Sequence, residues 1–281
     1  MRTAFITLSS EGAALFPRLA AGLGGADFFL HESVAPVPGA TAFAKIQNLV
    51  SEIFPEYRAL IFAAPCGAVV RALAGCVRHK KTDPAVVVLD VGARWCVSLL
   101  SGHEGGANDL ALRISNVLGS EPVITTTTEA VKNVIVGVGC RRGVPAQEIV
   151  TAIRSALDQT GVALTEVRLL ASADIKADEP GLHQAAAQLG LPLRIIASEE
   201  IRRCGREFAR SKFVEEHVRV PAVAEPAALL AGRRTSLFLP KTVFQKVTVA
   251  LARECCTWSD WGREIRSTAP AVPNKPSEKV K

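Results

Sequence analysis

The feature that most constrains the fold is an alternation of short apolar runs with stretches of helical periodicity, which occurs twice along the 281 residues. Up to about residue 128 the apolar runs are typical of buried strands, and this alternation predicts a largely parallel β-sheet flanked by helices. The expected strands are Thr3–Leu8, Asp27–Leu30, Arg58–Ala63, Ala85–Asp90, Trp95–Leu99 and Pro122–Thr126, and the expected helices are Ala13–Leu23, Ala42–Ile53, Gly67–Cys76 and Ala107–Leu118. A turn containing Gly92 separates the fourth and fifth strands, so these two should form a hairpin.

The pattern restarts near Val134, which predicts a second α/β domain. Its expected strands are Val134–Val138, Val167–Ala171, Leu193–Ile196, Ser236–Leu239 and Lys246–Ala252, and its expected helices are Ala146–Gln159, Leu182–Leu189, Phe213–His217 and Ala222–Ala231. We therefore predict domains over residues 1–130 and 131–253, followed by a disordered tail over 254–281 that is rich in Pro, Lys and Ser. The connector is very short, so the domains should share an interface, and clefts between domains often bind ligands.

Composition narrows the class of protein. Hydrophobic residues make up 48% of the chain and few are aromatic, which suits buried parallel strands. The N-terminus lacks a signal-peptide pattern and no apolar stretch is long enough to span a bilayer, so we expect a soluble cytoplasmic protein. The seven cysteines are scattered without a CxxC pair, which favours reduced core thiols over a metal site or disulfides.

The formal net charge of +6 is compatible with a solubilising surface or with a polyanionic partner. Arginine and lysine are not interleaved with aromatic residues, so we do not expect nucleic acid. The phosphate-binding patterns GxxxxGK[ST] and GxGxxG after a strand are also missing from the sequence, which argues against a nucleotide site.

The sharpest motif is SGHEGGAN, Ser101 to Asn108, between a predicted strand and an Ala/Leu-rich helix. Glycine permits positive φ angles and lets a ligand approach the backbone closely. Histidine is the side-chain type best suited to proton transfer near neutral pH, which makes His103 a candidate base. The alternative is a glycine-rich connector that carries a solvated histidine.

Three other segments of the first half are candidates for anion binding. Gly67–Arg71 follows a strand and opens a helix, which would point backbone N–H groups at the carboxyl edge of the sheet, although many such turns bind nothing. Lys81 precedes a buried strand, where a charge is usually only part of a solvated turn. Thr126 lies in a run of threonines at a strand end, which β-propensity explains in part.

In the second half, Cys140-Arg141-Arg142-Gly143 repeats the turn between strand and helix and adds paired arginines, a credible site for several carboxylates. The charged segment Asp174–Glu179 follows another strand, and helix capping or surface charge would explain much of it. Glu225 and Lys241 complete the candidates, each unremarkable alone.

Taken together and in this order, these segments resemble the cobalt-precorrin-5A hydrolase (CbiG) family of anaerobic cobalamin biosynthesis. The matching stretches are Gly67–Arg71, Lys81–Asp90, Ser98–Leu110, Pro122–Thr126, Gly137–Gly143 (GVGCRRG), Ala171–Leu191, Phe213–Val218, Val223–Leu230 and Leu239–Lys241. The combination of SGHEGGAN, GCRRG and ASADIKADEPGL is specific. Members commonly carry some tens of residues between the halves, whereas here Thr128 and Val134 are nearly contiguous, so that middle segment is absent or vestigial.

The resemblance implies hydrolytic opening of the δ-lactone of cobalt-precorrin-5A and release of acetaldehyde, giving cobalt-precorrin-5B. Cobalt travels in the substrate, so neither a cofactor nor a protein metal site is implied. The partner is a small-molecule tetrapyrrole, with no nucleic acid and no membrane. The resemblance is also compatible with a homodimer and with contacts to other cobalamin-pathway enzymes. The competing hypotheses are a non-catalytic corrinoid carrier and a methyltransferase of the pathway, although no glycine-rich S-adenosylmethionine loop is present.

We assign roles as hypotheses. His103 would be the general base, assisted by Glu104, and backbone N–H groups around Gly102–Gly106 would stabilise the oxyanion. The histidine-bearing turn and the arginine-bearing turn should face a common crevice. The expected substrate-binding residues are Gly67, Arg71, Lys81, Ser101, Gly102, Gly105, Gly106, Asn108, Thr126, Cys140, Arg141, Arg142, Asp174, Lys176, Glu179, Glu225 and Lys241.

Overall fold

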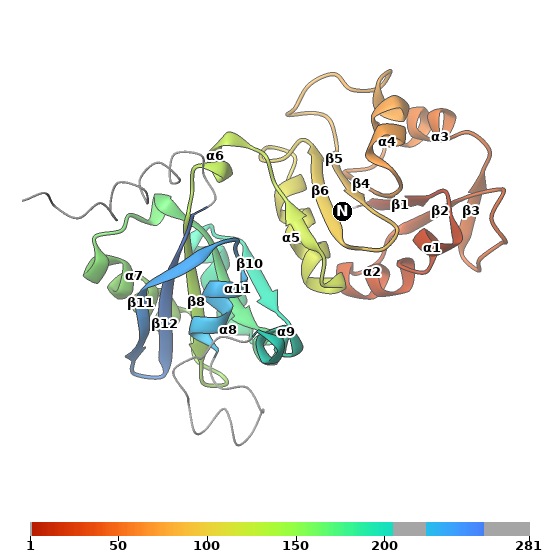
Figure 1. Ribbon diagram of the computed structural model, residues 1–281. Helices are drawn as coiled ribbons and strands as arrows, with labels where there is room; N and C mark the ends of the chain where they lie inside the picture. The colour runs from red at the N-terminus through yellow and green to blue at the C-terminus, as the bar shows by residue number, and fades with distance from the viewer. Residues whose placement is uncertain (1, 205–222, 256–281) are drawn as a thin grey trace, which may run out of the picture.

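The computed structural model describes residues 2–204 and 223–255, which form two separate mixed sheets, each largely parallel and flanked by helices (Figure 1). This is the predicted fold class. The N-terminal half (residues 2–130) holds one sheet and the C-terminal half (residues 133–255) holds the other. We propose that the predicted boundary at residue 130 marks two domains, because it falls in the connector between the sheets.

The sheet of the N-terminal half has the strand order β3-β2-β1-β4-β5-β6-β7. The β5–β6 pairing is antiparallel, as the predicted hairpin requires, and the other pairings are parallel. Its elements are β1 (Thr3–Thr7), α1 (Ser10–Ala13), α2 (Phe16–Leu23), β2 (Asp27–His31), β3 (Ala40–Phe43), α3 (Ile46–Ile53), β4 (Ala59–Ala63), α4 (Cys66–Leu73), β5 (Ala85–Leu89), β6 (Trp95–Leu100), α5 (Ala107–Leu118), β7 (Glu121–Val123) and α6 (Thr127–Ala130).

The sheet of the C-terminal half has the order β10-β9-β8-β12-β11, in which β8, β9 and β10 are parallel and β12 is antiparallel to both its neighbours. Its elements are β8 (Val134–Cys140), α7 (Ala146–Thr160), β9 (Val167–Ala173), α8 (Pro180–Leu189), β10 (Leu193–Ile196), α9 (Ser198–Arg203), α11 (Ala224–Leu230), β11 (Thr235–Phe244) and β12 (Val247–Glu254), with short 3-10 turns at Leu164–Glu166 and Asp174–Lys176.

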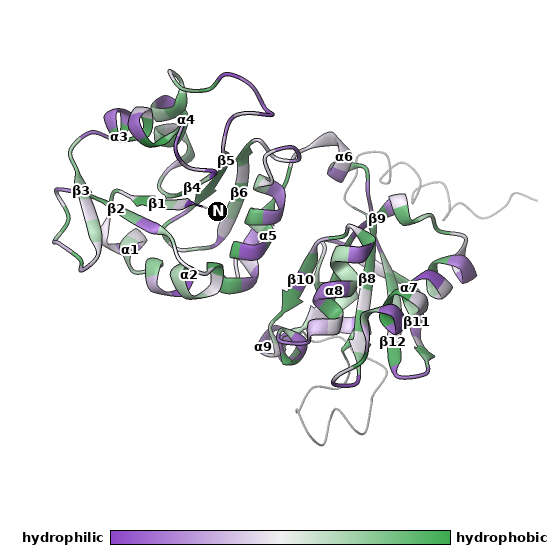
Figure 2. Ribbon diagram, turned by 180° about the vertical axis from the view of Figure 1, so that it is seen from behind, coloured by the Kyte–Doolittle hydropathy of each residue, from purple (hydrophilic) through white to green (hydrophobic). Residues whose placement is uncertain are grey.

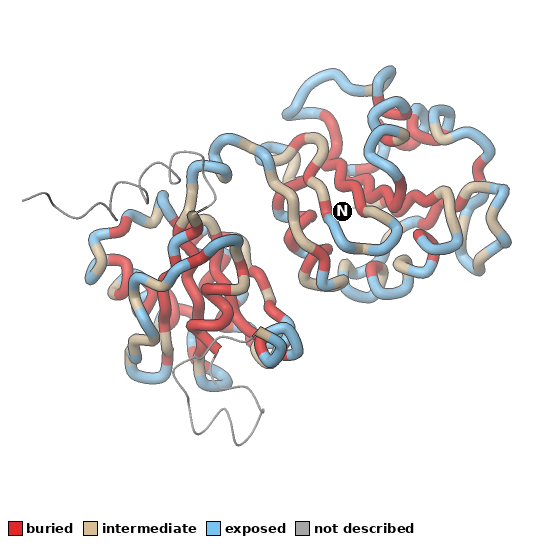
Figure 3. Tube along the Cα trace, in the orientation of Figure 1, coloured by how far each residue is buried: buried red, intermediate tan, exposed pale blue. Residues whose placement is uncertain are grey.

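Each sheet is covered on both faces, because alternate strand residues point to opposite sides. In the N-terminal half, Ala4 and Ile6 of β1 face α3 and α4, whereas Phe5 faces α1, α2 and α5. In the C-terminal half, α7 and α8 pack on one face and α9 and α11 on the other. Figures 2 and 3 show the result as apolar, buried strands inside a more polar, exposed outer layer. Among the described residues, no helix combines the length and apolar character needed to cross a membrane.

Several predicted boundaries were wrong. The helix expected over Ala42–Ile53 begins at Ile46, because residues 40–43 pair with β2 as an edge strand. The helix expected over Ala13–Leu23 is divided into α1 and α2, since Pro17 lies in the first turn of α2 and proline disfavours a helix interior. The predicted strand over Pro122–Thr126 ends at Val123. The predicted helix at Phe213–His217 and all but the first two residues of the predicted tail lie outside the described residues.

The two halves share the interface that the short connector predicts. The side chain of Asn116 on α5 donates to the Leu193 carbonyl (2.8 Å) and accepts from the Ile195 N–H (2.9 Å), which occupies the free edge of β10. Beside it, Arg194 forms an ion pair with Glu121 of β7 at 2.8 Å. In Figure 1, α5 accordingly faces β10.

Candidate functional site

The SGHEGGAN motif forms a tight turn between β6 and α5. Ser101 and Gly106 adopt positive φ angles of 56° and 84°. A Cβ on Gly102 would lie 2.7 Å from Thr126 Cγ2, and one on Gly105 would lie 2.4 Å from Ser101 Cβ. The three glycines are therefore needed to build the turn itself.

Asn108 fixes this turn to its neighbours. Its buried side chain accepts from the Ser98 hydroxyl at 2.8 Å and donates to the Thr126 hydroxyl at 3.0 Å. Its backbone N–H donates to the Gly102 carbonyl at 2.9 Å. Asn108 was predicted to bind substrate, but in this structure its carboxamide holds the turn in place, and Thr126 is its partner.

Replacing Asn108 with alanine should lower the free energy of unfolding by about 2 kcal/mol, because the buried Ser98 hydroxyl would lose its acceptor. Urea denaturation followed by circular dichroism measures this. Asn48→Ala, at an exposed position of α3, is the matched control and should change stability by less than about 0.5 kcal/mol. Equal effects of the two substitutions would contradict the proposed role of Asn108.

His103 and Glu104 occupy the exposed tip of the turn. Among the described residues, none forms a hydrogen bond with the His103 ring, so the ring is open to a ligand. Glu104 instead forms an ion pair with Lys80 at 2.5 Å, and the pKa of Glu104 is lowered by the hydrogen bond from Lys80 and by the Glu104 backbone N–H. The lowered pKa favours the ionised form of Glu104.

Lys80 is a residue that the sequence prediction missed. We expected Lys81 to bind substrate, but the neighbouring lysine contacts the turn, while the Lys81 N–H donates to the His79 ring at 3.3 Å. Two adjacent lysines look equivalent in a sequence. Only the fold of the loop before β5, in which Asp83 accepts from the N–H groups of Arg78 and His79, decides which of them reaches Glu104.

The predicted oxyanion donors are only partly free. The N–H groups of Gly105 and Ala107 both donate to the Ser101 carbonyl, at 3.1 and 3.2 Å. Within the described part of the chain, the N–H groups of Gly102, His103 and Gly106 have no acceptor. These three remain as candidates to stabilise negative charge.

Gly67 and Arg71 lie at the opposite edge of the same sheet. Gly67 follows the carboxyl end of β4, next to the end of β5, whereas antiparallel β6 delivers the His103 turn beside the start of β5. The Arg71 guanidinium donates to the Gly67 carbonyl at 2.9 Å, within its own helix. Gly67 and Arg71 therefore do not join the His103 turn.

The other predicted residues gather at or beside the carboxyl edge of the second sheet. They are Cys140, Arg141, Arg142, Asp174, Lys176, Glu179, Glu225 and Lys241. The pKa of the Cys140 thiol is raised, mainly because the thiol is buried. The positive charge of nearby Lys176 opposes this rise.

Three carboxylates in this cluster hold the backbone. Glu179, which is buried, accepts the Gly143 N–H at 2.8 Å, Asp174 accepts the Ser198 N–H at 2.9 Å, and Glu225 accepts the Lys241 N–H at 2.8 Å. We infer that these carboxylates shape the edge. Arg141 and Arg142 are exposed at this edge, and Arg142 forms an ion pair with Asp178 at 3.8 Å. We propose that these two arginines could bind an anion.

The expected common crevice is wrong. The His103 turn contacts Thr126, at the start of the connector that leads into β8, whereas Arg141 follows the last residue of β8. The full length of this strand separates the two turns, and Figure 1 shows its far end pointing away from the N-terminal half. One ligand cannot be gripped in a crevice common to both turns in this arrangement.

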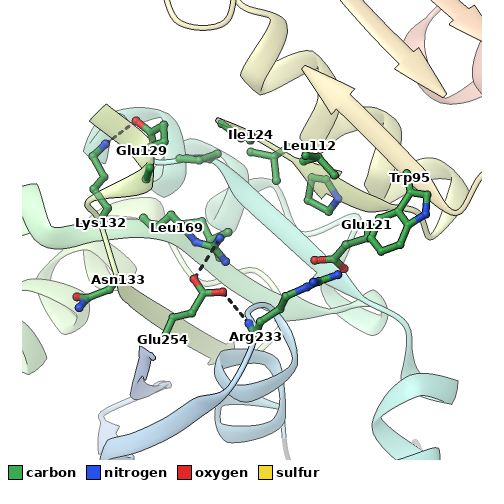
Figure 4. Close-up of a pocket in the computed structure, with 15 residues that line it drawn as sticks. Trp95, Leu112, Glu121, Ile124, Glu129, Lys132, Asn133, Leu169, Arg233 and Glu254 are labelled. Carbon is green, nitrogen blue, oxygen red and sulfur yellow. Dashed lines mark hydrogen bonds and ion pairs between the residues drawn. The ribbon is translucent and has the colours of Figure 1, made fainter. Parts of the chain in front are cut away.

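A cavity of about 480 Å³ lies instead where the two halves meet (Figure 4). Its walls come from β6, β7 and the connector on one side and from the starts of β9 and β11 and the end of β12 on the other. Side chains of Trp95, Glu121, Lys132, Arg233 and Glu254 line it. None of the predicted site residues does.

Comparison with known proteins decides the family. The model of the N-terminal region of cobalamin synthesis G matches residues 48–129, and the model of its C-terminus matches residues 134–252. The chain belongs to the cobalamin synthesis G (CbiG) family.

Proteins similar to this chain cover one or both of its halves. A protein named cobalt-precorrin-5A hydrolase from Salmonella typhimurium is 28% identical and takes in 82% of this chain and 92% of that protein. Protein CobE from a Sinorhizobium species is 35% identical over 128 residues, which are 45% of this chain and 83% of that protein. The crystal structure of a CobE protein matches 43% of this chain and 89% of that chain, with 33% identity and a TM-score of 0.41.

This CbiG chain lacks residues that a relative carries. The alignment with the Salmonella protein extends over 326 residues, more than the 281 of this chain, so that relative carries residues without a counterpart here. The matches to the two family models are only four residues apart. Both findings agree with the expected absence of a middle segment.

The cavity residues of this CbiG chain gave little signal in the sequence. Arg233 and Arg234 precede a strand and look like a charged turn, and Trp95 looks like the start of a strand. They become neighbours only because β6 and the start of β11 meet across the joint between the halves, where the Arg233 guanidinium lies 5.5 Å from the Trp95 ring centroid.

Proposed function

We propose that this CbiG chain is a cobalt-precorrin-5A hydrolase, which opens the δ-lactone of its tetrapyrrole substrate and releases acetaldehyde. Relatives that carry this name align over most of the chain, including both halves. Cobalt enters and leaves within the substrate.

The proposed reaction consumes one water. His103 takes a proton from water as its oxygen attacks the lactone carbonyl, and the acyl–oxygen bond breaks. The carbonyl becomes a carboxylate, and the former ring oxygen becomes a hydroxyl on the methylated bridge carbon. That hydroxyl then loses its proton to solvent while the bond from its carbon to the macrocycle breaks. The electron pair of the broken bond stays on the macrocycle, and the carbon leaves as acetaldehyde.

The free N–H groups of Gly102, His103 and Gly106 are placed on the same turn as this base. Donors that already point at the developing oxyanion need no reorganisation during the reaction, which is worth about 3 kcal/mol per donor.

The observation that carries the proposal is the position of the His103 turn. The tip of the turn is exposed, and Asn108 fixes the other end of the turn to Thr126. Thr126 lies two residues after Ile124, which is part of the cavity wall. A short segment that is hydrogen-bonded to the turn therefore joins it to one wall of the cavity.

Anaerobic incubation of the purified protein with cobalt-precorrin-5A tests the function. We expect enzyme-dependent acetaldehyde, trapped as a hydrazone, and none with heat-denatured protein. Corrinoid binding without acetaldehyde would reject the hydrolase and support the carrier alternative, in which the arginine sites bind the corrinoid tightly without turnover.

A further inference from the structure

We propose that the edge of the N-terminal sheet beside the His103 turn binds carboxylate arms of the substrate through Arg58, Arg78 and Lys81, which we call the basic edge. The identity of the ligand rests on the proposed function, whereas its chemistry, a molecule with several carboxylates, follows from the residues themselves. The N-terminal half would then hold by itself the arms that lie nearest the base.

The directions of the strands bring these three cations to the His103 turn. The loop that carries Arg78 and Lys81 leads into β5, and antiparallel β6 ends beside the start of β5. On the other side of β5, the Arg58 carbonyl accepts the Ala85 N–H at 3.0 Å. Neighbouring strands lie about 4.8 Å apart, so the backbone of Arg58 lies roughly 10 Å from the start of the turn.

Hydrogen bonds within the loop before β5 fix its backbone. The buried carboxylate of Asp83 accepts the N–H groups of Arg78 and His79 at 2.8 and 3.0 Å. The His79 ring accepts the Lys81 N–H at its Nδ1, at 3.3 Å, so a neutral ring carries its proton on Nε2, where it can be donated to a ligand. Side chains that start from a fixed backbone lose less freedom when they bind.

An ion pair joins this loop to the turn. Lys80 lies 2.5 Å from Glu104, the residue that follows His103 in the chain. Lys80 and Glu104 balance each other, so this pair adds no net charge to the basic edge. The pair does place the loop next to the candidate base, and Figure 3 shows the loop between α4 and β5 as mostly exposed.

The three cations of the basic edge are exposed and form no ion pair with any described residue. Acids near the starts of β2 and β4 are engaged elsewhere, because Asp27 and Glu56 pair with Arg2 at 3.1 and 3.0 Å. Asp109 of α5 and Glu52 of α3 form no ion pair with the three cations. All three are therefore available to the carboxylates of a ligand.

The basic edge and the turn together suit a ring with several acid arms. Guanidinium groups bind carboxylates through two parallel hydrogen bonds, and such charge-assisted bonds are about twice as strong as neutral ones. The N–H groups of Gly102, His103 and Gly106 would receive the lactone carbonyl while arms of the same ring reach Arg58 and Lys81. Binding of the arms would thus orient the lactone toward the base.

The test uses two cobalt corrinoids that differ in their arms. Cobyrinic acid carries free carboxylates and cobinamide carries amides, and equilibrium dialysis with the full chain measures both dissociation constants. We expect the wild-type protein to bind cobyrinic acid more tightly than cobinamide. The double variant Arg78→Gln/Lys81→Gln should weaken cobyrinic acid about tenfold to a hundredfold and change cobinamide by less than about twofold. Arg58→Gln alone should weaken cobyrinic acid about threefold to tenfold.

A matched control separates the basic edge from surface charge in general. Arg154→Gln removes an exposed arginine of α7, in the C-terminal half, that likewise forms no ion pair with a described residue. This variant should bind cobyrinic acid as the wild type does. Thermal unfolding confirms that each variant is folded, which we expect because none of the replaced side chains holds another described residue in place.

Failure of the wild-type protein to prefer cobyrinic acid, or binding that the double variant leaves unchanged, would overturn the inference. So would a loss of binding that occurs in Arg141→Gln/Arg142→Gln instead. The acetaldehyde assay distinguishes this failure from failure of the proposed function. Weaker cobyrinic acid binding in the double variant supports the basic edge even if no acetaldehyde forms. Acetaldehyde release with binding that is insensitive to the double substitution rejects the basic edge alone.

Discussion

Replacement of His103 by glutamine is expected to slow acetaldehyde release by about a hundredfold to ten-thousandfold, the usual contribution of a positioned general base. Glutamine retains a polar side chain of similar reach but cannot accept the proton of the attacking water. Because no described residue forms a hydrogen bond with the His103 ring, and the turn is shaped by Gly102, Gly105, Gly106 and Asn108, the variant should fold normally. Single-turnover rates with cobalt-precorrin-5A give the effect.

The control is His31→Gln, which removes a histidine of β2 that bonds to Ser33 and to the Ala44 carbonyl, at the other end of the sheet. It should release acetaldehyde at the wild-type rate. A His103→Gln variant with unchanged melting temperature and unchanged turnover would remove His103 from the mechanism. A base elsewhere would then have to be sought.

The second large effect concerns stability. Gly137→Ala should lower the free energy of unfolding by about 3 kcal/mol or more, because the new Cβ would lie 1.9 Å from the Ala224 carbonyl oxygen and 2.8 Å from Ala228 Cβ. These atoms belong to α11, which packs directly on β8. Guanidinium denaturation followed by circular dichroism measures the loss.

Gly75→Ala is the matched substitution, because a Cβ there meets nothing within 4 Å and the glycine has no positive φ. It should change stability by less than about 0.5 kcal/mol. If Gly137→Ala were equally mild, the close approach of α11 to β8 would be refuted. The result also bears on the GVGCRRG motif, whose first glycine we explain by packing and not by a ligand.

Most of the fold was predictable from the sequence, because buried strands and amphipathic helices leave periodic apolar patterns. The exceptions are instructive. Edge strand β3 is short and half-exposed, so its residues carry no such pattern, and its pairing with β2 defines it. The division of α1 from α2 was marked by Pro17 but needed the structure to locate it.

The site was predictable only in its local parts. The glycine turn and its exposed histidine follow from residue type and spacing. Which edge of a sheet each turn occupies depends on strand direction, and antiparallel β6 places His103 away from Gly67. Contacts such as Trp95–Arg233 join distant segments and leave no local signal.

The proposed reaction depends on attack of water at the lactone carbonyl, catalysed by this chain. A single turnover of cobalt-precorrin-5A in water labelled with oxygen-18, followed by mass spectrometry of the corrinoid, tests it most directly. We predict one labelled oxygen in a carboxylate of the corrinoid product, formed together with an equal amount of acetaldehyde. An unlabelled corrinoid product, or substrate recovered intact from the complex, would contradict the account.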